Sequence, residues 1–478
     1  MVTDMEYIIT GVRHNRVFNI FEEICAIPHG SGNEAGVARY IAEYARSKGC
    51  FVTVDSDNNV FVRKNAKAGC EHLPTVLLQG HTDMVCEKNA DTEHNFLTDG
   101  LKLFVKDGKI GAKGTTLGAD NGIAVAYMLS LLSEDTKPCI EMLFTVCEET
   151  GLEGAKSFDV SNITAKRMIN LDSEEDDTVT TGCAGGVRTD ISIPLEYGCE
   201  CDAVKVKICG LAGGHSGAEI NSGKSSAVVL MGRLLCMLDA ELDIKLSSVI
   251  CTGKDNAISR ECYSVIGGDK EKIAAVCAKF KAQTAGELID LDVGFDVMVE
   301  KYGRAKMLTK EIKDSIVCLM ACARCGVLKM SNHIKGLVEY SRNLGTIKID
   351  GSNLVFTFSS RSSVEAQLDS SMRELDVFGK AIGGSVAHYE RYPGWEYKPN
   401  SPLRDEYIAA YSQLFGATPK VSVIHAGLEC GIISDKLSGD IDIISVGPNL
   451  SDIHSPSERA DIASCERIYD ILLYLLCR

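Results

Sequence analysis

In LLQGHTDMV, residues 77–85, an apolar run typical of a strand ends at Gly80. His81 and Asp83 follow it. Two interpretations compete for this change. The polar residues either turn into solvent at an ordinary strand end, or they are a metal ligand and its hydrogen-bond partner at the carboxyl edge of a sheet. A single His-x-Asp favours the first, so the choice depends on the other strand ends of the chain.

Short apolar runs that alternate with amphipathic helices surround this stretch. TVLLQG, IEMLFTVCEET and KRMINLDSE each end in polar residues, and the predicted helix NGIAVAYMLSLLSED lies between the first two. This alternation indicates an α/β fold with a mostly parallel sheet covered on both faces. Ligand sites in such sheets form outside the carboxyl ends of the strands. The polar residues at those ends are His81, Glu148, Glu149 and Asp172.

The pattern changes after about residue 185, where strand, helix, strand, strand and helix follow in an order that then partly repeats. Two βαββαβ-like halves account for this length. The proline-rich YPGWEYKPNSP, which starts at Tyr392, marks the return to the first pattern. We predict a catalytic domain formed by residues 1–185 and 392–478, with an inserted α+β lid domain over residues 186–391.

Composition excludes several classes of function. The 478 residues carry a net charge of −16, which argues against a general binder of nucleic acid or anionic membranes. Neither a signal peptide nor an apolar run of transmembrane length is evident. Without a secretory signal, the 20 cysteines are expected to be reduced in the cytoplasm. Cys318, Cys322 and Cys325 have a spacing known from iron–sulfur sites, but one predicted helix carries them, which favours core packing.

Further polar residues complete a candidate metal centre. Asp120 stands in a glycine-bearing turn before a helix, and His454 in a polar loop after a buried strand. Each has an ordinary alternative, such as a helix N-cap for Asp120 or a solvated surface for His454. Taken together, two imidazoles and three carboxylates suit zinc or a similar divalent ion. They suffice for two metals if one carboxylate bridges them.

Several motifs give the chain a resemblance to a known family. On GHTDMV, TLGADNGI, CEETGLEGA, NLDSE, GGHSG, HAGLECG and GPNLSDIHSPSE, it resembles the zinc-dependent aminoacyl-histidine dipeptidases, relatives of carnosinase in a co-catalytic metallopeptidase superfamily. The resemblance implies that Asp120 bridges two metals, with Glu148 as general base and Asp83 orienting His81. The other implied metal ligands are His81 and Asp172 for one ion, and Glu149 and His454 for the other.

The predicted lid carries candidate substrate-binding residues. His215, between glycines in AGGHSG, would donate a hydrogen bond to the developing oxyanion, with Asn256 beside it. Arg361, in FSSRSS, suits bidentate capture of a free carboxylate, although a strand arginine on the surface is the simpler alternative. Glu429, in HAGLECG, would contact the amino group of the substrate.

The resemblance implies a dinuclear metallo-dipeptidase that hydrolyses Xaa-His and broader unblocked dipeptides. We expect two divalent ions, zinc first, with cobalt or manganese as alternatives. The expected partners are small dipeptides, with no nucleic acid or membrane, and the chain would act as a monomer or homodimer. One alternative is an N-acyl-amino-acid deacylase or desuccinylase of the same superfamily. Another is a non-catalytic metal-binding regulator, which the loss of a ligand or of the base would have favoured.

Overall fold

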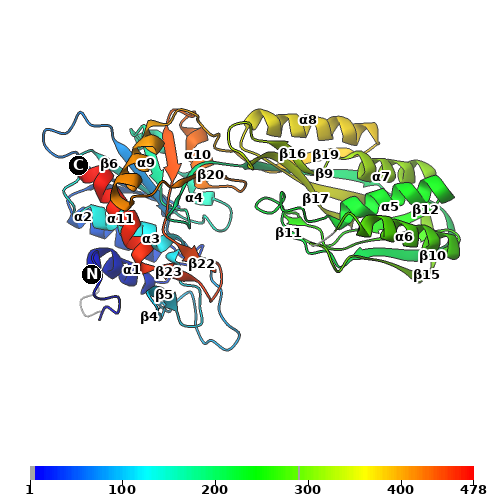
Figure 1. Cartoon of the computed structure of the whole chain (residues 1–478), viewed down its shortest axis with the longest axis horizontal. Coiled ribbons are helices and arrows are strands. Elements are labelled where there is room, and N and C mark those ends of the chain that lie inside the picture. Colours follow the sequence, from blue (N-terminus) through cyan, green and yellow to red (C-terminus); the bar gives the residue numbers. More distant parts are fainter. Residues whose placement is uncertain (1–5, 289–290) are drawn as a thin grey trace. The chain divides into compact units, whose positions relative to one another are not determined.

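The computed structural model describes residues 6–288 and 291–478, which form two compact units (Figure 1). Unit 1 joins the chain up to Gly182 with Trp395–Val423 and Leu428–Arg478. Unit 2 comprises Cys183–Gly394 and the short segment Ile424–Gly427. The predicted division assigns this last segment to the catalytic domain.

Unit 1 is built around an eight-stranded sheet. Its order is β1 (Phe51–Val54), β2 (Val60–Lys64), β6 (Ile140–Thr145), β3 (Val76–His81), β7 (Arg167–Asn170), β21 (Asp442–Ser445), β8 (Thr178–Cys183) and β20 (Lys420–Ile424). The central strands β6, β3, β7 and β21 run parallel, whereas the β1–β2 hairpin joins β6 in antiparallel fashion. The parallel centre brings the carboxyl ends of β6, β3 and β7 to one edge of the sheet.

Helices pack on this sheet, and the most buried of them follows the candidate metal segment. The helices are α1 (Asn15–Cys25), α2 (Ala35–Ser47), α3 (Ala119–Leu131), α4 (Glu153–Ser157), α9 (Pro402–Phe415), α10 (Glu429–Lys436) and α11 (Ile462–Cys477). α3 is apolar on every side and buried from Asn121 to Leu131, where it contacts α1 and β3. A small sheet, β22 (Leu450–Ser451), β23 (Arg459–Asp461), β5 (Lys109–Ala112) and β4 (Leu103–Lys106), completes the unit.

Unit 2 has two halves, and the first is a βαββαβ arrangement. It consists of β10 (Tyr197–Cys209), α5 (Ala227–Leu242), β12 (Lys245–Ile250), β14 (Cys262–Gly267), α6 (Lys270–Ala285) and β15 (Asp296–Leu308). The antiparallel sheet has the order β12-β14-β10-β15, and α5 and α6 lie side by side against it (Figure 1). The short strands β11 (Gly214–His215) and β13 (Ala257–Ile258) pair beside it.

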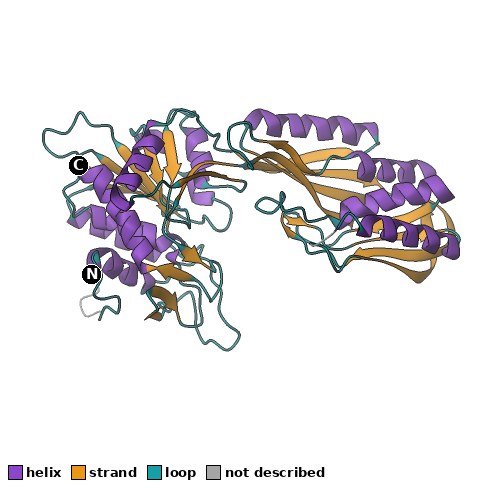
Figure 2. Ribbon diagram, viewed as in Figure 1, coloured by secondary structure: helices purple, strands orange, loops and turns teal. Residues whose placement is uncertain are grey.

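The second half contains one strand more than the predicted pattern. Its elements are β9 (Gly185–Pro194), α7 (Lys310–Cys322), β16 (Gly326–Met330), β17 (Val338–Asp350), β18 (Asn353–Ser362), α8 (Glu365–Ala381) and β19 (Ser385–Tyr392). They form a sheet of order β16-β17-β18-β9-β19, shown with its helices in Figure 2. β18 is buried almost throughout, so polar side chains on it lie inside the unit.

The architecture is the predicted class: an α/β unit with a parallel centre and an inserted α+β unit. No disulfide bond joins the cysteines of the described residues. The predicted core packing of Cys318 and Cys322 is wrong, because α7 buries the face of Ile316, Leu319 and Met320 and leaves both thiols exposed. Each helix of the described residues is too short or too polar to cross a lipid bilayer.

Candidate active site

His81 is the last residue of β3, and its imidazole is buried among carboxylates. Its Nε2 lies 3.2 Å from Asp120 Oδ1 and 3.3 Å from Asp172 Oδ1. Its Nδ1 lies 3.0 Å from the backbone carbonyl oxygen of Asp83 and 3.5 Å from the Asp83 carboxylate. Asp83 therefore orients the ring chiefly through its backbone, and Nε2 faces the other carboxylates.

The carboxylate of Asp83 holds the strand end that carries both glutamates. It accepts hydrogen bonds from the backbone N–H of Glu148 (3.0 Å) and Glu149 (3.2 Å) and from the hydroxyl of Ser31 (2.7 Å). Burial alone would raise the pKa of Asp83, but these donors and His81 outweigh it and lower the pKa. Asp83 thus stays ionised and fixes the Glu148–Glu149 backbone.

Asp120 lies between two histidines and offers one oxygen to each. Its Oδ1 faces His81, and its Oδ2 lies 3.2 Å from His454 Nε2. The same His454 nitrogen lies 2.9 Å from Glu149 Oε1. Ligand atoms of His81, Asp120 and Glu149 all lie within 4.8 Å of one another. The five predicted metal ligands thus form one connected group, with Asp120 at its centre.

The charge of this group calls for a cation. Burial raises the pKa of Asp172 to about 6 and that of Glu148 well above its usual value. Hydrogen bonding to Asp120 and Glu149 raises the pKa of His454 to about 10. No lysine or arginine of the described residues forms an ion pair with these carboxylates. Hard oxygen and imidazole donors suit divalent ions, so the residues fit a divalent-cation site.

Glu429 lies at the start of α10 and is fully buried. Its Oε2 accepts hydrogen bonds from the Thr145 hydroxyl (2.7 Å) and from the Gln79 side-chain amide, and burial raises its pKa to about 7. Its Oε1 is buried without a hydrogen-bond partner among the described residues. The contact of Glu429 with a substrate's amino group stays a prediction.

Unit 2 contains a second polar cluster, around Arg361 on β18. Arg361 is 9% exposed, and its guanidinium donates to the Tyr392 hydroxyl at 2.9 Å, while its Nε lacks a partner among the described residues. Ser341, opposite Arg361 on β17, lies 2.7 Å from His425 Nε2. Burial, followed by the charge of Arg361, lowers the pKa of His425 to about 4. The Arg361 guanidinium thus has an N–H donor without a partner and lies near a neutral histidine, an arrangement that suits an anionic ligand.

His215 belongs to this second cluster, and its tautomer is fixed by the backbone. Its Nδ1 accepts hydrogen bonds from the N–H groups of Gly217 (3.3 Å) and Ala218 (3.0 Å), which leaves the proton on Nε2. Burial and the charge of Arg361 lower the pKa of His215. His215 is thus a neutral donor. Asn256 lies beside it, because Ala257 pairs with His215 across the β11–β13 ladder.

Gly217 allows these groups to approach one another. A Cβ atom at this position would lie 2.4 Å from the carbonyl oxygen of His425 and 3.2 Å from Arg361 Nε. Sequence reasoning missed His425, Ser341 and Tyr392, although His425 stands in the motif HAGLECG. The missing information was the pairing of β17 with β18, which places Ser341 opposite Arg361.

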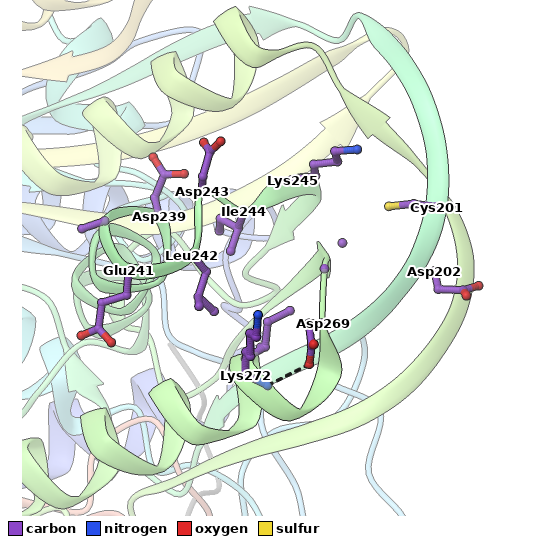
Figure 3. A pocket seen from close by; sticks show the side chains of 14 residues that line it. Cys201, Asp202, Asp239, Glu241, Leu242, Asp243, Ile244, Lys245, Asp269 and Lys272 are labelled. Carbon is purple, nitrogen blue, oxygen red and sulfur yellow. Dashed lines mark hydrogen bonds between the residues drawn. The ribbon is translucent and has the colours of Figure 1, made fainter.

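A separate cavity of about 670 Å³ opens in unit 2 between the end of α5 and the turn before α6 (Figure 3). Its lining includes Asp239, Asp243 and Asp269, and Asp269 caps α6 by accepting from the N–H of Lys272. None of the residues predicted for the site lines it. Acidic side chains in a solvent-open hollow are typical of a hydrated surface, so the cavity has no part in the site.

Comparison with known proteins gives consistent matches over nearly the whole chain. Residues 77–478 match the family model Peptidase family M20/M25/M40. The chain is 34% identical over 469 residues to the cytosol non-specific dipeptidase of Escherichia coli (strain K12), covering 96% of each chain. The solved aminoacylhistidine dipeptidase from Vibrio alginolyticus has a TM-score of 0.91 at 30% identity and covers 98% of this chain and 97% of its own. An aminopeptidase from Bacillus cereus, with a TM-score of 0.57 at 15% identity over 97% of this chain and 98% of its own, shares the fold.

Proposed function

Because the chain belongs to peptidase family M20/M25/M40, we propose that it hydrolyses unblocked dipeptides with two bound divalent cations. The two relatives reported at 30% identity or more are named dipeptidases, one non-specific and one for aminoacyl-histidine substrates. The chain is accordingly a peptide hydrolase with Xaa-His and broader dipeptides as its substrates. The observation that carries the proposal is the Asp120 carboxylate, which offers one oxygen toward His81 and the other toward His454.

In this proposal the ligands divide into two sets that share Asp120. His81 and Asp172 complete the first set, and Glu149 and His454 the second. Two cations held by these residues would activate a water and polarise the scissile carbonyl. Glu148 would be the general base, whose carboxylate would accept a proton and pass it to the leaving amine. Its raised pKa supports this role, because a buried carboxylate holds a proton readily.

We further propose that the Arg361 cluster of unit 2 contains substrate-binding residues. Arg361 takes the peptide carboxylate, for which its partnerless Nε is available. His215 donates from Nε2 to the developing oxyanion, and Asn256 assists from beside it. The neutral His425 lies at the Arg361 cluster without adding a second positive charge.

The native metal and the compartment are parts of the same proposal. Zinc fits the mixture of imidazole and carboxylate donors, with cobalt or manganese as substitutes. A cytoplasmic location agrees with the cytosolic relative. One chain holds both clusters, so a monomer or a homodimer would serve.

The test is a substrate panel with controlled metal content. Purified chain is stripped with a chelator and assayed with and without added zinc, on dipeptides and on N-acetyl and N-succinyl amino acids. We expect dipeptide hydrolysis that disappears on stripping and returns with zinc. Cleavage of only the N-acylated substrates would support the deacylase alternative, and zinc binding without any hydrolysis would support the regulator.

A further inference from the structure

Glu458 is a buried carboxylate with an unusual set of donors. It is 2% exposed and accepts hydrogen bonds from consecutive backbone N–H groups. Its Oε2 accepts from Leu117 (2.7 Å) and Gly118 (3.1 Å), and its Oε1 accepts from Ala119 (2.9 Å) and Asp120 (3.4 Å). Both oxygens are thus used to hold the backbone that carries Asp120.

The need for this carboxylate follows from the start of α3. The residue before the helix, Gly118, has φ +67°, and it has no side chain with which to cap the first N–H groups. A Cβ atom there would lie 2.9 Å from Met84 Sδ, so a larger capping residue does not fit. Buried N–H groups without an acceptor are destabilising. Glu458 supplies the missing acceptor from a position 338 residues further along the chain than Asp120.

The same residue closes the loop that carries His454. His454 and Asp452 both have positive φ, and the N–H of Glu458 donates to the carbonyl of Ser455 at 3.0 Å. Directly after Glu458, β23 pairs with β5 (Figure 1), so one end of the loop is anchored in the small sheet. Glu458 therefore links the segment of Asp120 to the loop of His454. Asp120 Oδ2 and His454 Nε2 lie 3.2 Å apart.

We propose that Glu458 is a positioning residue that pre-forms the cation site by fixing Asp120 relative to His454. The inference rests on the proposed function, in which both residues are metal ligands. Residues that orient metal ligands typically change metal affinity by about 10–100-fold when they are mutated. Glu458 acts on the backbone of one ligand and the loop of the other, so its loss should weaken binding of the cation that they share.

The test compares full-length variants that alter one buried carboxylate each. Glu458→Gln keeps the size but turns one acceptor oxygen into a donor that faces two N–H groups. Glu458→Asp keeps both acceptors but is one methylene shorter. Glu22→Gln is the matched control, since Glu22 is also 2% exposed and accepts from the backbone N–H groups of Ile8 and Ile9, away from any predicted ligand. Zinc affinity is measured by competition with a chelating dye, and Tm is measured on the metal-free proteins.

We expect Glu458→Gln to bind zinc about 10–100-fold more weakly, with Glu458→Asp in between. Glu22→Gln should lose Tm without losing zinc affinity. Wild-type affinity in Glu458→Gln, or an equal loss in Glu22→Gln, would overturn the inference. If Glu458→Gln does not fold, wild-type affinity in Glu458→Asp would overturn it as well. A wild-type chain that binds no zinc would instead overturn the proposed function, and the role of Glu458 with it.

Discussion

Replacement of Arg361 by alanine should abolish the preference for a free C-terminal carboxylate. Arg361 is 9% exposed, its Nε lacks a partner in the described chain, and its guanidinium donates one hydrogen bond there, to Tyr392. A carboxylate bound there would be desolvated and paired with a charge. Truncating one partner of such a buried pair costs about 2–5 kcal/mol. At about 1.4 kcal/mol per tenfold in rate, this corresponds to about 30- to 5,000-fold in kcat/KM.

The assay crosses two proteins with two substrates. Wild type and Arg361→Ala are each assayed on a dipeptide and on the same dipeptide as its C-terminal amide. The wild type should prefer the free acid by about 30- to 5,000-fold, and the variant should treat both substrates alike. Arg361→Lys should fall between them, because lysine keeps the charge but not the planar fork.

A neighbouring arginine provides the matched control. Arg342 on β17 is 2% exposed, and its hydrogen bonds go to Tyr340, Ser371 and Glu374 within the unit. Arg342→Ala should lower stability while leaving the acid-to-amide ratio unchanged. Equal losses on acid and amide in Arg361→Ala would refute the assignment of the carboxylate to Arg361.

Four further outcomes are expected. Glu148→Gln should keep its metal content by elemental analysis yet lose at least about 10²–10⁴-fold in kcat, and near-normal turnover would remove Glu148 from the mechanism. Chelator-treated protein should regain full activity at close to two added cations per chain, which activity without any bound metal would contradict. Gly217→Ala should lower kcat/KM for free dipeptides at unchanged metal content, because its Cβ would lie 2.4 Å from the His425 carbonyl oxygen; unchanged kcat/KM would argue against this close packing. The pKa of His425 is about 4 in the folded chain and about 6.5 in the unfolded chain. As pH falls, the unfolded chain therefore gains the proton first. Up to about 3 kcal/mol of the free energy of unfolding is lost between about pH 6.5 and 4. His425→Gln should show a flatter pH dependence of the unfolding free energy, and equal curves would exclude His425 as the cause.

The strand ends of unit 1 could be read from sequence because their information is local. An apolar run that stops at Gly80 identifies both the strand and the edge on which His81 stands, and the same holds for Glu148 and Asp172. The parallel pairing of β3 with β6 and β7 then brings these ends together. Local patterns therefore anticipated the meeting of these three strand ends, whereas Asp120 and His454 stand at no such end, and their roles came from the family resemblance.

The surroundings of Arg361 and Glu429 depend on contacts that no local pattern contains. His425 stands 84 residues from Ser341, and it follows β20, a strand of the other unit's sheet. Glu429 lies in a motif that looks like a loop, but its Oε2 accepts a hydrogen bond from Thr145, 284 residues away. Such distant partners set the burial and the hydrogen bonds of a carboxylate, and no local pattern contains them.

Asp83 and Glu458 serve the candidate site by the same physical means. Each is a buried carboxylate whose oxygens accept consecutive backbone N–H groups from a segment that carries predicted ligands: Glu148 and Glu149 for Asp83, and Leu117 to Asp120 for Glu458. Charge-assisted hydrogen bonds to a backbone fix both position and direction, whereas side-chain packing alone fixes shape. Both carboxylates also add negative charge beside the ligands, which favours cations over water. The ligand segments are therefore held by hydrogen bonds within the chain itself, and the free energy of cation binding need not be spent on ordering them.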